Sequence, residues 1–223
     1  MIEPFRLANG IDMPALGFGT FKLDGQTCRE AVAYALDVGY RHIDTADFYG
    51  NHTATGQALA HSGLPRDSVF LTTKLWYDRL QHDTVLQDTD RFLNELATPY
   101  IDLLLIHWPN PAIPMAETFE ALNQLYQKNK VKAVGVSNFN SEQLAQALDF
   151  PWQPVTVNQV EFHPFLYQKR LLDFCKKRRV VLQAYCPLAR GAVNADNTLC
   201  DVAQKHGATP TQAALRWLLH HGI

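Results

Sequence analysis

The stretch VFLTTKLWYDRLQHDTVLQDTDRFLNELATPYIDLLLIHW, residues 69–108, decides the fold. It opens with an apolar run at 69–74, continues with helical periodicity at 85–96, and closes with a second apolar run at 101–108. Both runs are almost continuously apolar, which is typical of strands buried on both faces of a parallel sheet. The order strand, helix, strand therefore predicts parallel α/β architecture.

The same alternation extends along the whole chain. Strand-length apolar runs are expected at 15–20, 42–47, 69–74, 101–108, 131–139, 155–162 and 180–187. Helical periodicity lies at 28–38, 52–61, 85–96, 116–127, 143–148, 169–177 and 199–205, and a last helix begins near Pro210. Asn9 and Gly10 stand between two short alternating runs, which predicts a β-hairpin ahead of the first strand.

Seven strands are one fewer than a (β/α)₈ barrel needs. We therefore expect residues 1–223 to form a single TIM-type (β/α)₈ barrel domain with an N-terminal β-hairpin, lacking the eighth strand and helix.

Composition excludes several classes of protein. The chain has 223 residues, of which 47% are hydrophobic and 19% charged, so it can bury a substantial core. A formal net charge of −2 argues against a nucleic-acid partner. The sequence shows no apolar run long enough to span a bilayer, and it shows no signal peptide. We therefore expect no membrane partner and a cytoplasmic location. Four cysteines and nine histidines show no metal-ligand spacing, so no metal is expected and the thiols are expected to be free.

Polar side chains stand at the carboxyl ends of three consecutive expected strands. Asp44, with Tyr49 just past it, is followed by Lys74 and then by His107. In parallel barrels these ends carry the chemistry, so the four groups should meet at one mouth. A phenol has an ordinary pKa of ~10. A neighbouring ammonium lowers that pKa, and a carboxylate can hold the ammonium in place. The set predicts a general acid, Tyr49, beside a histidine that holds a carbonyl oxygen.

A reducing cofactor is implied, because no side chain supplies a hydride. Gly17-Phe18-Gly19 is only a fragment of the dinucleotide fingerprint, and the sequence has no P-loop. Two other classes stay open at this point. One is a non-catalytic binding protein on the same scaffold, and the other is a metal-dependent barrel hydrolase.

Several longer stretches resemble those of one family. GYRHIDTADFYGN (39–51) and VKAVGVSNF (131–139), with the blocks TTKLW, LLLIHWP, NQVEFHP and AYCPLARG, resemble signatures of the aldo-keto reductase family. Within it the chain is most similar to the bacterial 2,5-diketo-D-gluconate reductases. The resemblance runs from the hairpin to the last residue. It implies a barrel, monomeric if complete, that binds NADP(H) and reduces aldehydes or ketones such as 2,5-diketo-gluconate or methylglyoxal.

The resemblance also implies roles for individual residues. Tyr49 would donate the proton, and Lys74, paired with Asp44, would lower its pKa. His107 would orient the carbonyl. The implied cofactor-binding residues are Gly19, Thr20, Phe21, Asp44, Ser137, Asn138, Gln159, Tyr185, Leu188 and Arg190. The implied substrate-binding residues are Phe18, Tyr49, Trp76, His107 and Trp108.

The chain departs from the family pattern in two places. His52 replaces an acid of the first signature and Thr55 replaces an aliphatic residue, which we expect to loosen the start of the helix at 52–61. The third signature, an Ile/Val-Pro-Lys-Ser/Thr strand that grips the cofactor's 2′-phosphate, should follow Ile223 and is not present. We therefore expect a C-terminally truncated reductase. The alternative is a catalytically impaired binding protein that holds NADPH poorly and exposes unpaired strand edges.

Overall fold

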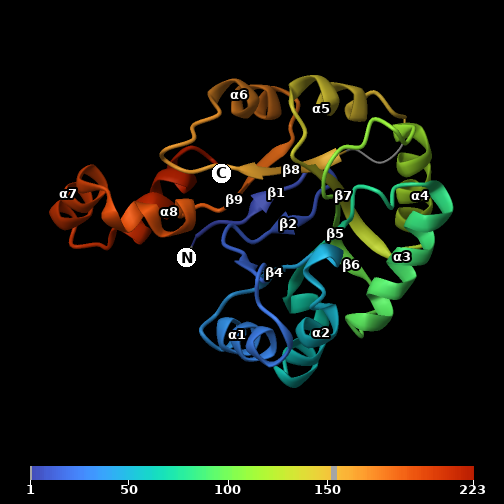
Figure 1. Ribbon diagram of the computed structural model, residues 1–223, viewed down its shortest axis with the longest axis horizontal. Coiled ribbons are helices and arrows are strands. Elements are labelled where there is room, and N and C mark those ends of the chain that lie inside the picture. Colours follow the sequence, from blue (N-terminus) through green and yellow to red (C-terminus); the bar gives the residue numbers. More distant parts are fainter. Residues whose placement is uncertain (1, 152–154) are drawn as a thin grey trace.

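The computed structural model describes residues 2–151 and 155–223. Its largest feature is a curled parallel sheet with strand order β3-β4-β5-β6-β7-β8-β9 (Figure 1). These strands are β3 Phe18–Gly19, β4 His42–Asp44, β5 Phe70–Leu75, β6 Ile101–Ile106, β7 Val131–Ser137, β8 Val155–Glu161 and β9 Val181–Tyr185. The parallel α/β architecture is confirmed, and the absence of an eighth strand and helix stays a prediction.

Helices α1 to α6 lie along the outer side of this curled sheet, whereas α7 and α8 lie beyond its β9 edge (Figure 1). The helices are α1 Gly25–Asp37, α2 His52–His61, α3 His82–Glu95, α4 Met115–Gln127, α5 Ser141–Leu148, α6 Lys169–Lys177, α7 Asn197–Lys205 and α8 Pro210–His220. Short 3₁₀ turns are η1 Asp47–Tyr49, η2 Arg66–Ser68 and η3 Ala189–Ala195. None of the helices in the described residues is long and apolar enough to cross a membrane.

The first strand of the sheet is shorter than the apolar run at 15–20 suggests. Within the described residues β3 pairs only with β4, through Phe18 opposite Ile43 and Gly19 opposite Asp44. Because β4 itself has three residues, few of its backbone groups are available to pair with β3. The expected hairpin is present, with β1 Phe5–Arg6 antiparallel to β2 Asp12–Met13.

The core has two layers, one on each face of the sheet. Side chains alternate along a strand, so Leu103 and Leu105 of β6 point to one face and Leu104 to the other. The larger layer fills the space between sheet and helices. In the smaller layer, inside the curl, Leu7 and Met13 of the hairpin region pack against the inward side chains of the strands. The hairpin region thus covers part of the interior of the sheet, and Phe5 and Met13 also face the cavity described below.

Helix α2 approaches α3 so closely that one position requires glycine. A Cβ on Gly56 would lie 2.6 Å from the carbonyl oxygen of Leu96, a backbone atom that cannot rotate away. Gly56→Ala is therefore expected to destabilise the fold by about 1–3 kcal/mol, the usual cost of overpacking. Urea unfolding measures this. Gly19→Ala is the control, because a Cβ there meets nothing within 4 Å, and equal losses of stability in both variants would contradict the prediction.

Candidate active site

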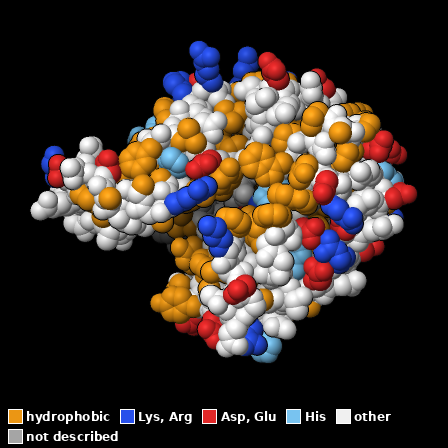
Figure 2. Space-filling model, viewed as in Figure 1, with side chains coloured by type: hydrophobic (Ala, Val, Ile, Leu, Met, Phe, Trp, Pro, Cys, Tyr) orange, Lys and Arg blue, Asp and Glu red, His pale blue; other side chains and the backbone are white. Residues whose placement is uncertain are grey.

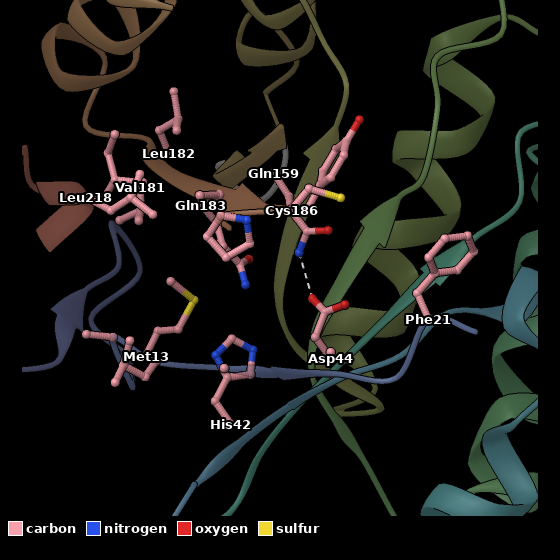
Figure 3. Close-up of a pocket in the computed structure, with 18 of the residues that line it drawn as sticks. Met13, Phe21, His42, Asp44, Gln159, Val181, Leu182, Gln183, Cys186 and Leu218 are labelled. Carbon is pink, nitrogen blue, oxygen red and sulfur yellow. Dashed lines mark hydrogen bonds between the residues drawn. The ribbon is translucent and has the colours of Figure 1, made fainter. Parts of the chain in front are cut away.

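A cavity of about 420 Å³ extends from the carboxyl ends of the strands, where Tyr49 and His107 line it, along β9 to α8 and the N-terminal hairpin. Figure 2 shows hydrophobic side chains gathered around this hollow, between the part that carries α7 and α8 and the rest of the molecule. Figure 3 shows its polar floor, with Asp44 and Gln159 in contact and His42 nearby. The expected site residues that line it are Gly19, Phe21, Asp44, Tyr49, Trp76, His107, Trp108, Asn138, Gln159, Tyr185 and Arg190.

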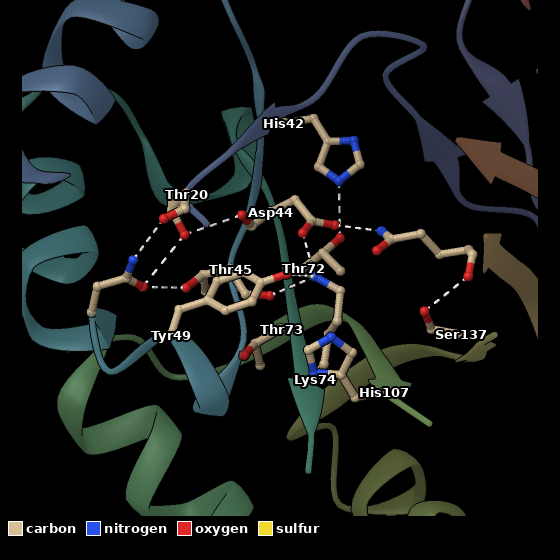
Figure 4. Close-up of polar contacts among 12 residues, drawn as sticks. Thr20, His42, Asp44, Thr45, Tyr49, Thr72, Thr73, Lys74, His107 and Ser137 are labelled. Carbon is tan, nitrogen blue, oxygen red and sulfur yellow. Dashed lines mark hydrogen bonds and ion pairs between the residues drawn. The ribbon is translucent and has the colours of Figure 1, made fainter. Parts of the chain in front are cut away.

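Lys74 lies at the centre of the polar contacts (Figure 4). Its side chain is fully buried near the end of β5, and its ammonium forms an ion pair with the carboxylate of Asp44. The same Nζ donates to the carbonyl oxygen of Thr45 at 2.9 Å and to the hydroxyl of Tyr49 at 3.5 Å. Since β4, β5 and η1 each supply one of these groups, the fold alone brings Asp44, Lys74 and Tyr49 together.

The environment of Tyr49 favours its protonated form. Burial raises the pKa of the phenol, and Lys74 opposes this by lowering it. Burial has the larger effect, so the pKa of Tyr49 lies above its ordinary value. Lys74 therefore lowers the pKa of Tyr49 as expected, but the net pKa is raised and not lowered. Tyr49 holds its proton at neutral pH.

His107 follows β6 and packs edge-on against two aromatic rings. Its centroid lies 5.8 Å from that of Tyr49 and 5.2 Å from that of Trp76. Burial, with a smaller contribution from Lys74, lowers the pKa of His107 to about 3. The ring is therefore neutral at pH 7. Its buried Nδ1 has no hydrogen-bond partner in the described part of the chain, so placing the single proton on Nε2 avoids an unpaired buried N–H.

The neutral ring of His107 predicts that acid destabilises the fold. Between pH 6.5 and about 3 the unfolded chain binds a proton on this histidine that the folded chain does not, so stability falls as the pH drops through that window. Urea midpoints at pH 7 and pH 5 should therefore differ less for His107→Gln than for the parent. His61→Gln, at an exposed histidine, should behave like the parent. Identical pH dependence in all three proteins would contradict the prediction.

The ends of β7, β8 and β9 are tied to the same site by side-chain amides and hydroxyls. Gln159 donates from Nε2 to Oδ2 of Asp44 at 2.6 Å, which occupies the carboxylate oxygen that Lys74 leaves free. Tyr185 donates to Oδ1 of Asn138 at 3.0 Å. Asn138 donates to the carbonyl oxygen of His107 at 3.0 Å. These contacts hold two amide side chains and one aromatic ring around the cavity.

Some of the expected site residues do not line the cavity. Thr20 and Ser137 are buried, and their hydroxyls donate to the carbonyl oxygens of Asp44 (3.3 Å) and Gln159 (2.8 Å). Leu188, just before η3, is also absent from the cavity lining.

Phe18 lies away from the cavity and packs edge-on against Tyr40, with 5.9 Å between the ring centroids. Its neighbours Gly17 and Gly19 line the cavity instead. The alternation of side chains along a strand explains this difference. The structure therefore gives Phe18 a place in the outer core and not beside the cavity.

Sequence reasoning missed two residues that shape the site. Phe48 stacks on Trp76 at 4.1 Å, and its position next to Tyr49 was the available signal. Asn51 is buried and donates to the carbonyl oxygens of Thr20 (2.9 Å) and Leu23 (2.8 Å). It thereby holds the loop that carries Phe21, and its place at the end of the quoted 39–51 stretch could have marked it.

The segment after β9 contains several residues in the left-handed region of backbone conformation. Cys186, Ala189 and Arg190 have φ angles of 49°, 48° and 55°, followed by 93° at Gly191. Non-glycine residues in this conformational region are strained and cluster at functional sites. Arg190 also lines the cavity.

The fold is a curled parallel α/β sheet, and the cavity reaches the carboxyl ends of its strands, which is where parallel-barrel enzymes carry their chemistry. Residues 15–222 match the Aldo/keto reductase family. The chain therefore belongs to the aldo-keto reductase family, whose members are oxidoreductases that generally depend on a nicotinamide cofactor.

The names of similar proteins indicate the kind of reaction. Glyoxal reductase of Bacillus subtilis is 40% identical over 223 residues, which covers 99% of this chain and 80% of the relative. Methylglyoxal reductase DkgB of Salmonella typhimurium is 36% identical over 213 residues, or 94% of this chain and 80% of the relative. A solved structure described as "a putative 2,5-diketo-D-gluconic acid reductase B" has 41% identity and a TM-score of 0.95, and the match covers 100% of this chain and 79% of that one. These similarities support carbonyl reduction.

Proposed function

We propose that residues 1–223 form a single barrel domain that reduces aldehydes or ketones to alcohols with NADPH. The observation that carries this proposal is the buried Lys74, which contacts both the carboxylate of Asp44 and the hydroxyl of Tyr49. Bound reduced nicotinamide would supply a hydride to the carbonyl carbon. The remaining steps belong to side chains that line the cavity and to the buried Lys74 beneath them.

Tyr49 supplies the proton that balances this reaction. As the carbonyl carbon gains the hydride, its oxygen takes the phenolic proton, and Tyr49 is left as a phenolate. The ammonium of Lys74, 3.5 Å away, stabilises that phenolate, and solvent returns the proton afterwards. The Nε2–H of neutral His107 donates to the same carbonyl oxygen and orients it toward Tyr49.

The cofactor would be held by residues from three strands and the turn after them. The amides of Asn138 and Gln159 suit the nicotinamide carboxamide, and the ring of Tyr185 suits its flat face. Arg190 suits a phosphate, as a guanidinium binds phosphate oxygens through paired donors. The preference for NADPH over NADH follows from the resemblance.

The relatives and the cavity together favour a small carbonyl substrate. Relatives are named for glyoxal and methylglyoxal, and we propose the same class here. Trp76, Trp108 and Phe48 provide aromatic walls beside His107. Such walls cover the apolar part of a small dicarbonyl and leave its oxygen to the polar floor.

The test is an assay of NADPH oxidation with glyoxal, methylglyoxal and 2,5-diketo-gluconate as substrates. We expect turnover that requires NADPH and is unaffected by a metal chelator, which separates a reductase from a metal-dependent hydrolase. Cofactor binding without turnover, in a chain shown to be folded, would favour the binding-protein alternative.

A further inference from the structure

A set of polar contacts on the helix side of the sheet surrounds the turn that carries Tyr49. The turn is η1, and α2 begins three residues after Tyr49. Asp47 precedes Tyr49 and His52 follows it, and both side chains make contacts outside the cavity. The two anchors therefore bracket the phenol in the sequence.

The first anchor is Asp47. Nη2 of Arg91, on α3, lies 2.9 Å from Oδ1 of Asp47 and 3.2 Å from Oδ1 of Asp88. The other guanidinium nitrogen, Nη1, lies 3.1 Å from Oε1 of Glu95. Because Asp88 and Glu95 also belong to α3, Arg91 is held by its own helix while it holds the turn.

The second anchor is His52, which is 3% exposed. Its Nδ1 lies 2.9 Å from Oε2 of Glu95, and its Nε2 lies 2.7 Å from Oγ1 of Thr73. Phe92 packs edge-on against the ring, with 4.8 Å between centroids. His52 thus reaches α3 with one nitrogen and β5 with the other.

These contacts join into one chain of partners, because Glu95 binds both Arg91 and His52. The chain ends at Thr73, whose neighbour in β5 is Lys74. We call the five residues Asp47, Arg91, Glu95, His52 and Thr73 the helix-side clamp. The clamp connects the turn that carries Tyr49 to the strand that carries Lys74, through contacts that do not touch the cavity.

We propose that His52 is a positioning residue that sets the separation between the hydroxyl of Tyr49 and the ammonium of Lys74. The proposal rests on the proposed function, in which this pair donates the proton. That separation is 3.5 Å, at the long end for a hydrogen bond. A small displacement of η1 would therefore break the contact, and misplacement by 1 Å can cost about 100-fold in rate.

The neutral form of His52 satisfies both of its partners. Nδ1–H can donate to Glu95, and Nε2 can accept from the hydroxyl of Thr73. Burial has the largest influence and leaves the pKa of His52 below its ordinary value. The carboxylates of Glu95 and Asp47 oppose this by raising the pKa, and Arg91 lowers it. The expectation that His52 loosens the start of α2 is thus not met, since the helix begins with this residue buried and bonded at both nitrogens.

The decisive variants remove the clamp contacts without changing side-chain bulk greatly. His52→Leu removes both hydrogen bonds, and Thr73→Val removes one with almost the same shape. His61→Leu is the matched control, because His61 ends the same helix and is exposed. We expect kcat for NADPH-dependent reduction to fall about 10- to 100-fold in His52→Leu, with KM within about twofold, and to stay unchanged in His61→Leu. His52→Gln should recover part of the loss, because a carboxamide can both donate and accept.

A titration of Tyr49 tests the clamp independently of turnover. The tyrosinate absorbance of each protein, minus that of the same protein carrying Tyr49→Phe, isolates this phenol from the other tyrosines. Weakening the contact with Lys74 should raise the pKa of Tyr49 in His52→Leu and Thr73→Val. His61→Leu should titrate like the parent.

An unchanged titration and an unchanged kcat in both clamp variants would overturn the proposal. If His52→Leu does not fold, Thr73→Val and His52→Gln decide the question. If the parent shows no turnover, or Tyr49→Phe retains it, the proposed function fails, while the titration still shows whether His52 positions the phenol.

Discussion

Tyr49→Phe is expected to lower turnover about a thousandfold while leaving NADPH binding nearly unchanged. The loss follows from the removal of the proton donor, since general acid catalysis contributes about 10²- to 10⁴-fold. Phenylalanine keeps the ring that packs against Phe21 at 5.1 Å and against His107 at 5.8 Å, so the cavity keeps its shape. Loss of reduced-nicotinamide absorbance measures turnover, and quenching of protein fluorescence by NADPH measures binding.

The control is Tyr77→Phe. Tyr77 is close to the site, in ring contact with Trp76, but does not line the cavity. Its variant should keep the parent's rate. Retention of more than about a tenth of the parent's turnover in Tyr49→Phe would remove Tyr49 from the mechanism.

Lys74→Met should damage both stability and turnover. The ammonium of Lys74 is fully buried, and its removal leaves the carboxylate of Asp44 with Gln159 as its remaining side-chain partner. Breaking a buried ion pair on one side costs about 3–5 kcal/mol, because the other charge stays buried without compensation. Urea unfolding should show a loss of that order. Turnover should also fall steeply, because the phenolate of Tyr49 would lose its stabilising charge.

The double variant Lys74→Met with Asp44→Asn separates the two effects. An uncharged amide in place of the carboxylate removes the unpaired charge, so much of the stability should return. Turnover should remain low, because no ammonium faces Tyr49. If Lys74→Met alone were as stable as the parent, the ion pair with Lys74 would not be offsetting the free-energy cost of burying the carboxylate of Asp44.

The main elements of the fold could be predicted from the sequence because they depend on local pattern. The continuous apolar runs at 69–74 and 101–108 correspond to β5 and β6, and the periodicity at 52–61 and 169–177 corresponds to α2 and α6. The approach of Asp44, Tyr49 and Lys74 could also be predicted, since the ends of parallel strands meet on one side of a sheet.

The remaining features depend on contacts that no local pattern encodes. The net direction of the Tyr49 pKa depends on how deeply the folded chain buries the phenol. The partner of His52 is Glu95, 43 positions away, so a substitution that looks loosening in the sequence is satisfied in the structure. The orientation of Phe18 depends on the register of β3 against β4, in which Phe18 lies opposite Ile43.

Strand β5 serves two tasks with neighbouring residues on its opposite faces. Lys74 reaches Asp44 and Tyr49 on the cavity side, whereas Thr73 meets His52 on the helix side. Protein engineers could therefore treat the two faces as separate targets. Changes around α2 and α3 would adjust the speed of proton transfer with substrate preference intact, and changes at Trp76 or Trp108 would alter the choice of carbonyl with the acid left in place.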